Sequence, residues 1–130
     1  MTAWDPVARR PVWRIREDLP VWSGALATAG DLVFYGTMDG WFKALDARTG
    51  TELWRFKTGS GIIGQPVSYR GPDGKQYVAV LAGVGGWAGA IVSADLDPRD
   101  STAGTGWGAT MAGLQQATTK GGMLYVFALP

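Results

Sequence analysis

A tryptophan stands at the same distance behind an Ala–x–Asp segment at two places in the chain, 41 residues apart. The first copy is AWDPVARRPVW, from Ala3 to Trp13, and the second is ALDARTGTELW, from Ala44 to Trp54. A period of about forty residues is typical of propeller blades and of helical arrays. The chain has 20 glycines and seven tryptophans among its 130 residues, which favours turns and strands over helices. The repeat therefore predicts an all-β chain made of propeller blades.

Four short strands are expected between Leu26 and Lys57, which is the number in one antiparallel propeller blade. They include the runs LVFYGT (32–37) and WFKALDA (41–47), which are rich in aromatic and β-branched residues and are separated by a turn at MDG. Residues 51–59 alternate in side-chain type with a period of two, which predicts a half-buried strand.

These strands divide the chain into one complete blade and two partial ones. Residues 1–21 are expected to end one blade, residues 22–58 to form a complete blade, and residues 59–130 to form most of a closing blade. The strands expected in the closing blade are residues 62–69, 77–82 and 123–129, with a fourth strand supplied from elsewhere. The glycine-rich insertion at 83–122 has no clean periodicity, apart from a short helical turn expected near 111–116.

The tryptophans of the repeat are expected to be scaffold. Trp13 and Trp54 would be buried between neighbouring blades, because large aromatic side chains are the usual filling between sheets. Asp46 would accept hydrogen bonds from the backbone N–H groups of the turn that follows it. In the first copy, Ala8 and Arg9 replace the Thr–Gly pair of the second, so a different turn is expected there.

Composition excludes several kinds of chemistry. The net charge is +1 with no block of like charge, so nothing indicates a nucleic acid or an anionic membrane surface as a partner. The chain has no cysteine and no histidine, which removes thiolate metal sites and the commonest general base. It has no apolar stretch long enough to span a bilayer, and its first residues do not resemble a signal peptide. Lys43, Arg55 and Lys57 are expected to form a solvated strand face.

The aspartates are expected to cap turns. Three of them stand beside turn residues: Asp39, Asp46 and Asp73. Three others, in ADLDPRD, alternate as the oxygen ligands of a calcium loop do: Asp95, Asp97 and Asp100. That run lacks the glycine and the distal glutamate of the EF-hand pattern. That run is therefore not assigned as a calcium site.

The segment ALDARTGTELW resembles the tryptophan-docking motif of eight-bladed propeller dehydrogenases that use pyrroloquinoline quinone (PQQ). The resemblance to methanol and ethanol dehydrogenases covers almost all of the chain, from LPVWSGALATAGDLVFYGTMDGWFKALDARTGTELWRFKTG through GVGGWAG to GGMLYVFALP. The tail DLDPRDSTAGTGWGATMAGLQQATTKGG is more similar to the lanthanide-dependent branch than to the calcium branch. These enzymes are several times longer, so the chain resembles a C-terminal segment of one of them.

The resemblance implies a function for the whole enzyme and a role for two tryptophans. In the family, a primary alcohol is oxidised to an aldehyde on the quinone above a calcium or lanthanide ion, and the electrons pass to a cytochrome c in the periplasm. The metal ligands and the catalytic aspartate of the family lie upstream of the region matched here, so the resemblance assigns no catalytic residue and no metal ligand to this chain. Trp22 and Trp87, each among small residues, are implied to line the quinone pocket. The implied partners are the remaining blades and, in a homodimer, a second copy of the enzyme.

Two other interpretations stay open from the sequence. A non-enzymatic propeller, such as an outer-membrane assembly scaffold, carries a similar Ala–Asp–Thr–Gly–Trp pattern. The GVGGWAG stretch argues against it, because a scaffold has no need of an open, glycine-rich site on the propeller axis. The second alternative is a fragment without activity, and the 130 residues alone are expected not to oxidise alcohol.

Overall fold

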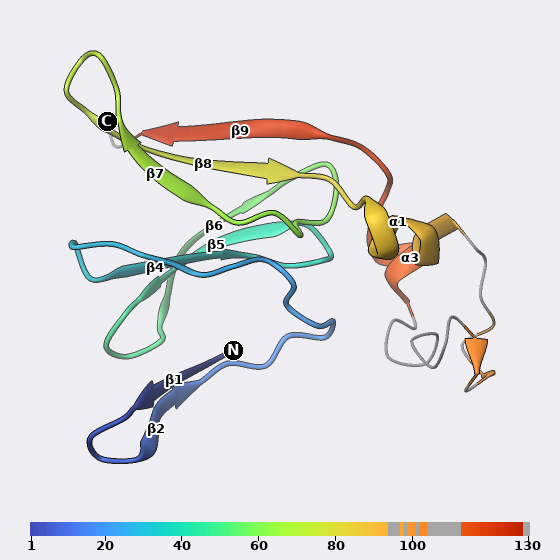
Figure 1. The fold of residues 1–130 in the computed structure, drawn as a ribbon, viewed down its shortest axis with the longest axis horizontal. Coiled ribbons are helices and arrows are strands. Elements are labelled where there is room, and N and C mark those ends of the chain that lie inside the picture. The colour runs from blue at the N-terminus through green and yellow to red at the C-terminus, as the bar shows by residue number, and fades with distance from the viewer. Residues whose placement is uncertain (94–96, 98, 101, 104–112, 129–130) are drawn as a thin grey trace.

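The chain forms three antiparallel sheets that lie in successive layers, as seen in the computed structural model (Figure 1). The structure describes residues 1–93, 97, 99–100, 102–103 and 113–128. The first sheet pairs β1 (Thr2–Asp5) with β2 (Arg10–Arg14). The second contains β3 (Leu26–Ala27), β4 (Leu32–Gly36), β5 (Trp41–Asp46) and β6 (Glu52–Lys57), paired in chain order. The third contains β7 (Val67–Arg70), β8 (Gln76–Ala82) and β9 (Met123–Ala128).

Two helices lie beyond one end of the sheets, between β8 and β9 in the chain (Figure 1). They are α1 (Gly86–Ser93) and α3 (Leu114–Ala117). Helix α3 overlaps the short helical turn expected near 111–116, whereas α1 falls where an irregular segment was expected, so that expectation was wrong. Within the described part of the chain, no helix has the length and apolar character needed to cross a membrane.

Most strands follow the sequence expectations, but the strand expected at 62–69 is confined to Val67–Arg70, so its first half was wrong. The four strands predicted between residues 26 and 57 form one sheet, and β9 pairs with β8 over its whole length, from Tyr77↔Ala128 to Ala82↔Met123. In β6 the side chains alternate between the two faces of the sheet as expected, but the strand is not half-buried. Every residue of β6 is exposed. A strand at the edge of its sheet has no outer neighbour, so even its inward side chains stay partly in solvent.

The main core lies between the second and third sheets. Phe42 and Ile62 are fully buried there and face Val78 and Val80 of β8. Phe42 lies 5.5 Å from Phe127 of β9, measured between ring centroids. Because the apolar faces of the two sheets cover each other, this contact is what holds the second and third layers together.

Trp54 reaches across this same junction but is not buried, which corrects the expectation. Its ring lies 5.2 Å from that of Phe127 and 6.1 Å from that of Phe42, in edge-on contacts with both. The side chain nevertheless stays 40% exposed. The reason is its place on the edge strand β6, where the described residues cover only the inward part of the indole.

Trp13 shows how the repeat joins one layer to the next. Its indole Nε1 donates a hydrogen bond to the carbonyl of Ala47, at 3.0 Å, in the turn of the second copy. Gly50, with φ of +74°, lies directly against the ring, because a Cβ at this position would be 2.7 Å from Trp13 Cδ2. The first sheet is therefore fastened to the second by an indole lying on the Asp–x–x–Thr–Gly turn.

The turns of the two copies have the same plan, contrary to the expectation of a different turn in the first. Asp5 Oδ1 accepts hydrogen bonds from Val7 N and Ala8 N, as Asp46 Oδ1 does from Arg48 N and Thr49 N. Arg9 adopts φ of +53° at the place that Gly50 occupies in the second copy. The aspartate cap determines the turn, and a non-glycine residue in the left-handed region costs about 1–2 kcal/mol.

The charged face of the second sheet divides into a buried and an exposed part. Arg55 and Lys57 are exposed as expected, and each lies 4.7 Å from the ring centroid of Trp41. The expectation was wrong for Lys43, whose side chain is only 11% exposed. Its ammonium group lies 2.9 Å from Glu17, so a buried lysine is paired with an acidic side chain from the segment between β2 and β3.

Candidate functional site

A second apolar cluster lies at the end of the sheets where the helices pack. Its fully buried members come from four separate segments: Met38, Val84, Ala88 and Leu114. Leu19, Trp22 and Ile63 pack against it from the loops. Because Ala88 of α1 and Leu114 of α3 are both buried here, this cluster sets where the start of α1 lies relative to the loop that carries Trp22.

Trp22 lies in the segment between β2 and β3, which has no regular structure, as expected. Its side chain is half-buried and packs against the apolar cluster. One face of this indole is therefore held by protein. Trp22 is therefore not a core residue like Phe42, which has no exposed surface at all.

Trp87 is the second residue of α1 and is 52% exposed. Ala88, next to it in the chain, is fully buried in the apolar cluster, so the helix is fixed while the indole is turned outward. Gly85 and Gly86 precede it, and a Cβ at either position would meet nothing within 4 Å. Gly86 has φ of +51°, a conformation that glycine adopts at little cost. A flat molecule could approach this backbone and the indole face closely.

The helix forms here because glycine permits a close contact that a larger residue would prevent. A Cβ on Gly89 would lie 2.9 Å from the carbonyl oxygen of Val84, so the first turn of α1 packs tightly on the short link between β8 and α1. Gly89 N also donates to the carbonyl of Gly85, at 3.0 Å. The glycine content that suggested an irregular segment is thus what lets the helix pack.

The last part of the insertion is bound to the loop between β6 and β7. Gly61 N donates to Thr118 Oγ1 at 2.6 Å, and Thr119 Oγ1 donates to the carbonyl of Gly59 at 2.8 Å. Gly83 N donates to the carbonyl of Gly61 at 2.7 Å. Loop 58–61 therefore holds both ends of the insertion, and sequence reasoning missed it because its hydrogen bonds join residues far apart in the chain.

The aspartates serve turns and ion pairs. Asp46 accepts from the N–H and hydroxyl groups of Thr49, which together with the N–H of Arg48 lower the pKa of its carboxyl below the ordinary value. Asp73 accepts from Lys75 N and the Tyr77 hydroxyl, confirming a turn role. Asp39 instead pairs with Lys57 at 3.6 Å.

The aspartates of the insertion are also engaged locally. Asp97 is bonded by the backbone and guanidinium groups of Arg99, and Asp100 by the N–H and hydroxyl of Thr102; both contacts lower the pKa of the carboxyl concerned. Asp95 lies outside the described residues. Over the residues that the structure describes, no group of three or more acidic side chains could hold a metal ion.

Three comparisons with known proteins bear on this arrangement. The family model described as "PQQ: Glucose/ethanol/alcohol dehydrogenase, beta-propeller domain" matches residues 6–78, more than half of the chain. A lanthanide-dependent methanol dehydrogenase of Methylacidiphilum fumariolicum (strain SolV) is 59% identical over 128 residues, which are 97% of this chain and 21% of that protein. A quinoprotein ethanol dehydrogenase of Pseudomonas aeruginosa is 45% identical over 130 residues, all of this chain and 18% of that protein.

The structural comparison agrees with the sequence comparisons. A europium-containing methanol dehydrogenase superposes with a TM-score of 0.89 at 57% identity, over 98% of this chain and 23% of that one. The stacked antiparallel sheets are thus those of a β-propeller. The chain belongs to the PQQ-dependent alcohol dehydrogenase family and spans about a fifth of the length of the curated relatives it matches. The resemblance to the lanthanide-dependent branch is confirmed, and the scaffold alternative is not supported.

The described residues around Trp87 suit one wall of a quinone site. Trp87 offers a broad, exposed aromatic face beside glycines that leave open space. A flat tricyclic molecule is recognised by such a surface. The described part of the chain has no comparable set of oxygen ligands for a metal ion.

Proposed function

We propose that this chain is the C-terminal segment of an eight-bladed, PQQ-dependent dehydrogenase that oxidises a primary alcohol, methanol or ethanol, to the aldehyde. Its 59% identity to a lanthanide-dependent methanol dehydrogenase over 128 residues carries the proposal. Residues 1–21 end one blade, residues 22–58 form a complete blade, and residues 59–130 form most of the closing blade. A cytochrome c accepts the electrons, the enzyme works in the periplasm, and a homodimer is part of the proposal.

Within this enzyme, Trp22 and Trp87 hold the quinone. The bound quinone supplies the two-electron acceptor, which no amino-acid side chain can provide. The described residues contribute position: α1 presents the outward indole of Trp87, and the apolar cluster supports Trp22 from behind. Both aromatic faces would exclude water from the quinone that lies against them. The family resemblance supports the further proposal that the calcium or lanthanide ion and the catalytic aspartate belong to other parts of the enzyme.

The test compares Trp87→Ala with Trp54→Ala in a complete propeller that carries this segment. One such protein is made by exchanging residues 1–130 into the 59% identical methanol dehydrogenase. Trp87→Ala should leave the melting curve of the apo-protein nearly unchanged, because 52% of the side chain is already in solvent, and should weaken PQQ binding and activity. Trp54→Ala should lower the melting temperature while the remaining folded protein binds PQQ as the parent does.

Two results would contradict the assignment. The first is that Trp87→Ala binds PQQ with the affinity of the parent, and the second is that it destabilises the apo-fold as much as Trp54→Ala does. Either outcome makes Trp87 a packing residue. A separate measurement concerns the 130 residues alone, which should show no dye-linked alcohol oxidation with PQQ and calcium or a lanthanide added. Chelator-sensitive turnover by this chain would show that it contains its own metal and base.

A further inference from the structure

The segment between β2 and β3 carries Trp22 and is tied to strand β4 at two points on either side of it. The first tie is Glu17. Its Oε1 accepts a hydrogen bond from the hydroxyl of Tyr35 at 2.5 Å, and both of its oxygens accept from Lys43 Nζ, at 2.9 and 3.0 Å. The side chains of Glu17 and Lys43 are 13% and 11% exposed, and Tyr35 is fully buried. Burial and the contact with Glu17 raise the pKa of the Tyr35 hydroxyl, which therefore stays a hydrogen-bond donor.

The second tie is Ser23. Its hydroxyl donates to the carbonyl of Gly36 at 2.9 Å and accepts from Gly36 N at 2.8 Å. Strand β3 pairs with β4 only at Val33 and Phe34, so the backbone groups of Gly36 lie beyond the end of β3. The Ser23 hydroxyl satisfies both groups, which a longer strand would otherwise pair. Gly36 is buried, so these backbone groups have little access to water.

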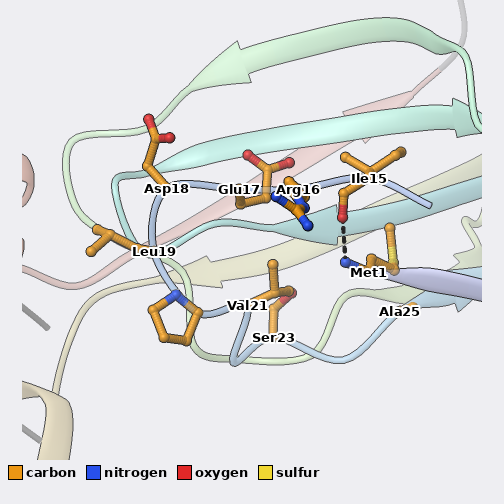
Figure 2. Close-up of a pocket in the computed structure, with 10 residues that line it drawn as sticks. Met1, Ile15, Arg16, Glu17, Asp18, Leu19, Val21, Ser23 and Ala25 are labelled. Atoms are coloured by element: carbon orange, nitrogen blue, oxygen red, sulfur yellow. Dashed lines mark hydrogen bonds between the residues drawn. The ribbon is translucent and has the colours of Figure 1, made fainter. Parts of the chain in front are cut away.

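The two ties bind to consecutive residues of β4, Tyr35 and Gly36, and enclose residues 18–22. Along its other side the segment borders a pocket of about 730 Å³, lined by Met1 and most of residues 15–25 (Figure 2). In Figure 2 the carboxylate of Glu17 points away from Val21 and Ser23, so the two ties reach β4 from different parts of the loop. Within this chain, the loop thus depends on these ties and on the contacts of Leu19 and Trp22 with the apolar cluster.

We infer that Glu17 and Ser23 are positioning residues that fix the indole of Trp22 at the quinone site. This inference rests on the proposed function, because it takes Trp22 to be one wall of that site. Its physical basis is that a five-residue loop closed at both ends has few conformations, whereas the same loop released at one end has many. A pre-organised indole binds a flat ligand without losing that freedom on binding.

The experiment follows Trp22 directly. The complete propeller described above is labelled with 5-fluorotryptophan, and the ¹⁹F resonance of Trp22 is assigned by its loss in Trp22→Phe. The variants are Glu17→Gln, which removes the charge at constant shape, and Ser23→Ala, which removes the hydroxyl. Ser23→Thr keeps the hydroxyl and serves as the rescue. Asp31→Asn is the matched control, because it removes an exposed ion pair of the same sheet, Arg48–Asp31 at 2.8 Å.

Glu17→Gln and Ser23→Ala should shift or broaden the Trp22 resonance in the apo-protein and raise the Kd for PQQ by about tenfold, as the loss of outer-shell partners does at other sites. Asp31→Asn and Ser23→Thr should change neither. An unmoved Trp22 resonance in both test variants overturns the inference; if Glu17→Gln does not fold, Ser23→Ala decides alone. A moved resonance with unchanged PQQ affinity upholds the ties and contradicts the proposed role of Trp22 in the quinone site.

Discussion

A methyl group added at Gly50 should cost more free energy of unfolding than one added at Gly74, although both glycines have nearly the same backbone conformation. Their φ angles are +74° and +79°. An L-residue in this region costs about 1–2 kcal/mol. At Gly74 that is the whole cost, because a Cβ there would meet nothing within 4 Å. Gly74→Ala should therefore destabilise its turn by about 1–2 kcal/mol.

At Gly50 the added Cβ would lie 2.7 Å from Cδ2 and 2.9 Å from Cγ of Trp13. These are atoms of a rigid ring, so the whole indole has to move. The movement breaks the hydrogen bond from Trp13 Nε1 to the carbonyl of Ala47, which is worth about 0.5–1.5 kcal/mol. Gly50→Ala should therefore cost about 1.5–3.5 kcal/mol. In a Trp13→Ala background the contact is absent, and the cost of Gly50→Ala should fall to that of Gly74→Ala.

The assay is native-state hydrogen exchange of the complete propeller, read in peptides that cover each turn. It gives the local opening free energy of the two turns separately, and Gly50 N is itself bonded to the carbonyl of Asp46 at 2.9 Å. The double-mutant comparison isolates the contact between Gly50 and Trp13. Equal costs for Gly50→Ala and Gly74→Ala, or a Gly50→Ala cost that Trp13→Ala leaves unchanged, would refute the reasoning.

Three further predictions concern stability. Trp54→Ala should cost about 2–3 kcal/mol, below the range for a fully buried aromatic side chain because 40% of Trp54 is exposed, and a denaturant titration showing a larger loss would contradict this. The isolated 130 residues should self-associate and melt broadly, because β9 is paired along one edge only and Leu124 is 63% exposed. A monodisperse monomer by size-exclusion chromatography with a sharp melt would contradict this prediction. Because the pKa of Asp46 is lowered in the folded state, its contribution is present above the unfolded pKa of about 3.9 and is lost as the pH falls through the folded value. Hydrogen exchange of this turn should therefore speed up relative to the pH-corrected intrinsic rate from about pH 6 to about pH 3 in the parent and not in Asp46→Asn, and equal behaviour of the two would contradict the cap.

Local features could be predicted from the sequence because they depend on neighbours in the chain. The strands followed from period-two patterns and turn residues, and the role of Asp46 from the turn that comes directly after it. The family followed from motifs that the comparisons confirmed. The wrong expectation of a different turn at Arg9 also concerned neighbouring residues. The hydrogen bonds to Asp5 determine this turn even though Arg9 stands where the second copy has a glycine.

The candidate site could be predicted only in part. The sequence singled out Trp22 and Trp87, and the structure places Trp22 and Ala88, the neighbour of Trp87, on one apolar cluster. The sequence could not show that Trp87 lies in the first turn of a helix, because α1 is held by Ala88 in that cluster and by a close contact between Gly89 and Val84. The cluster that buries Ala88 also contains Met38 and Leu114, which are distant from it in the chain, so no local pattern encodes it.

Burial was the property that only the tertiary structure decided. Lys43 has the sequence pattern of a solvated strand residue, yet it is buried because Glu17, 26 residues earlier, is folded against it. Trp54 has the pattern of a buried residue, yet it is 40% exposed because its strand lies at a sheet edge. The alternation of side chains determines which face of a strand each residue occupies. Whether that face meets solvent or protein depends on which other layer packs on it, and that is a contact between distant parts of the chain.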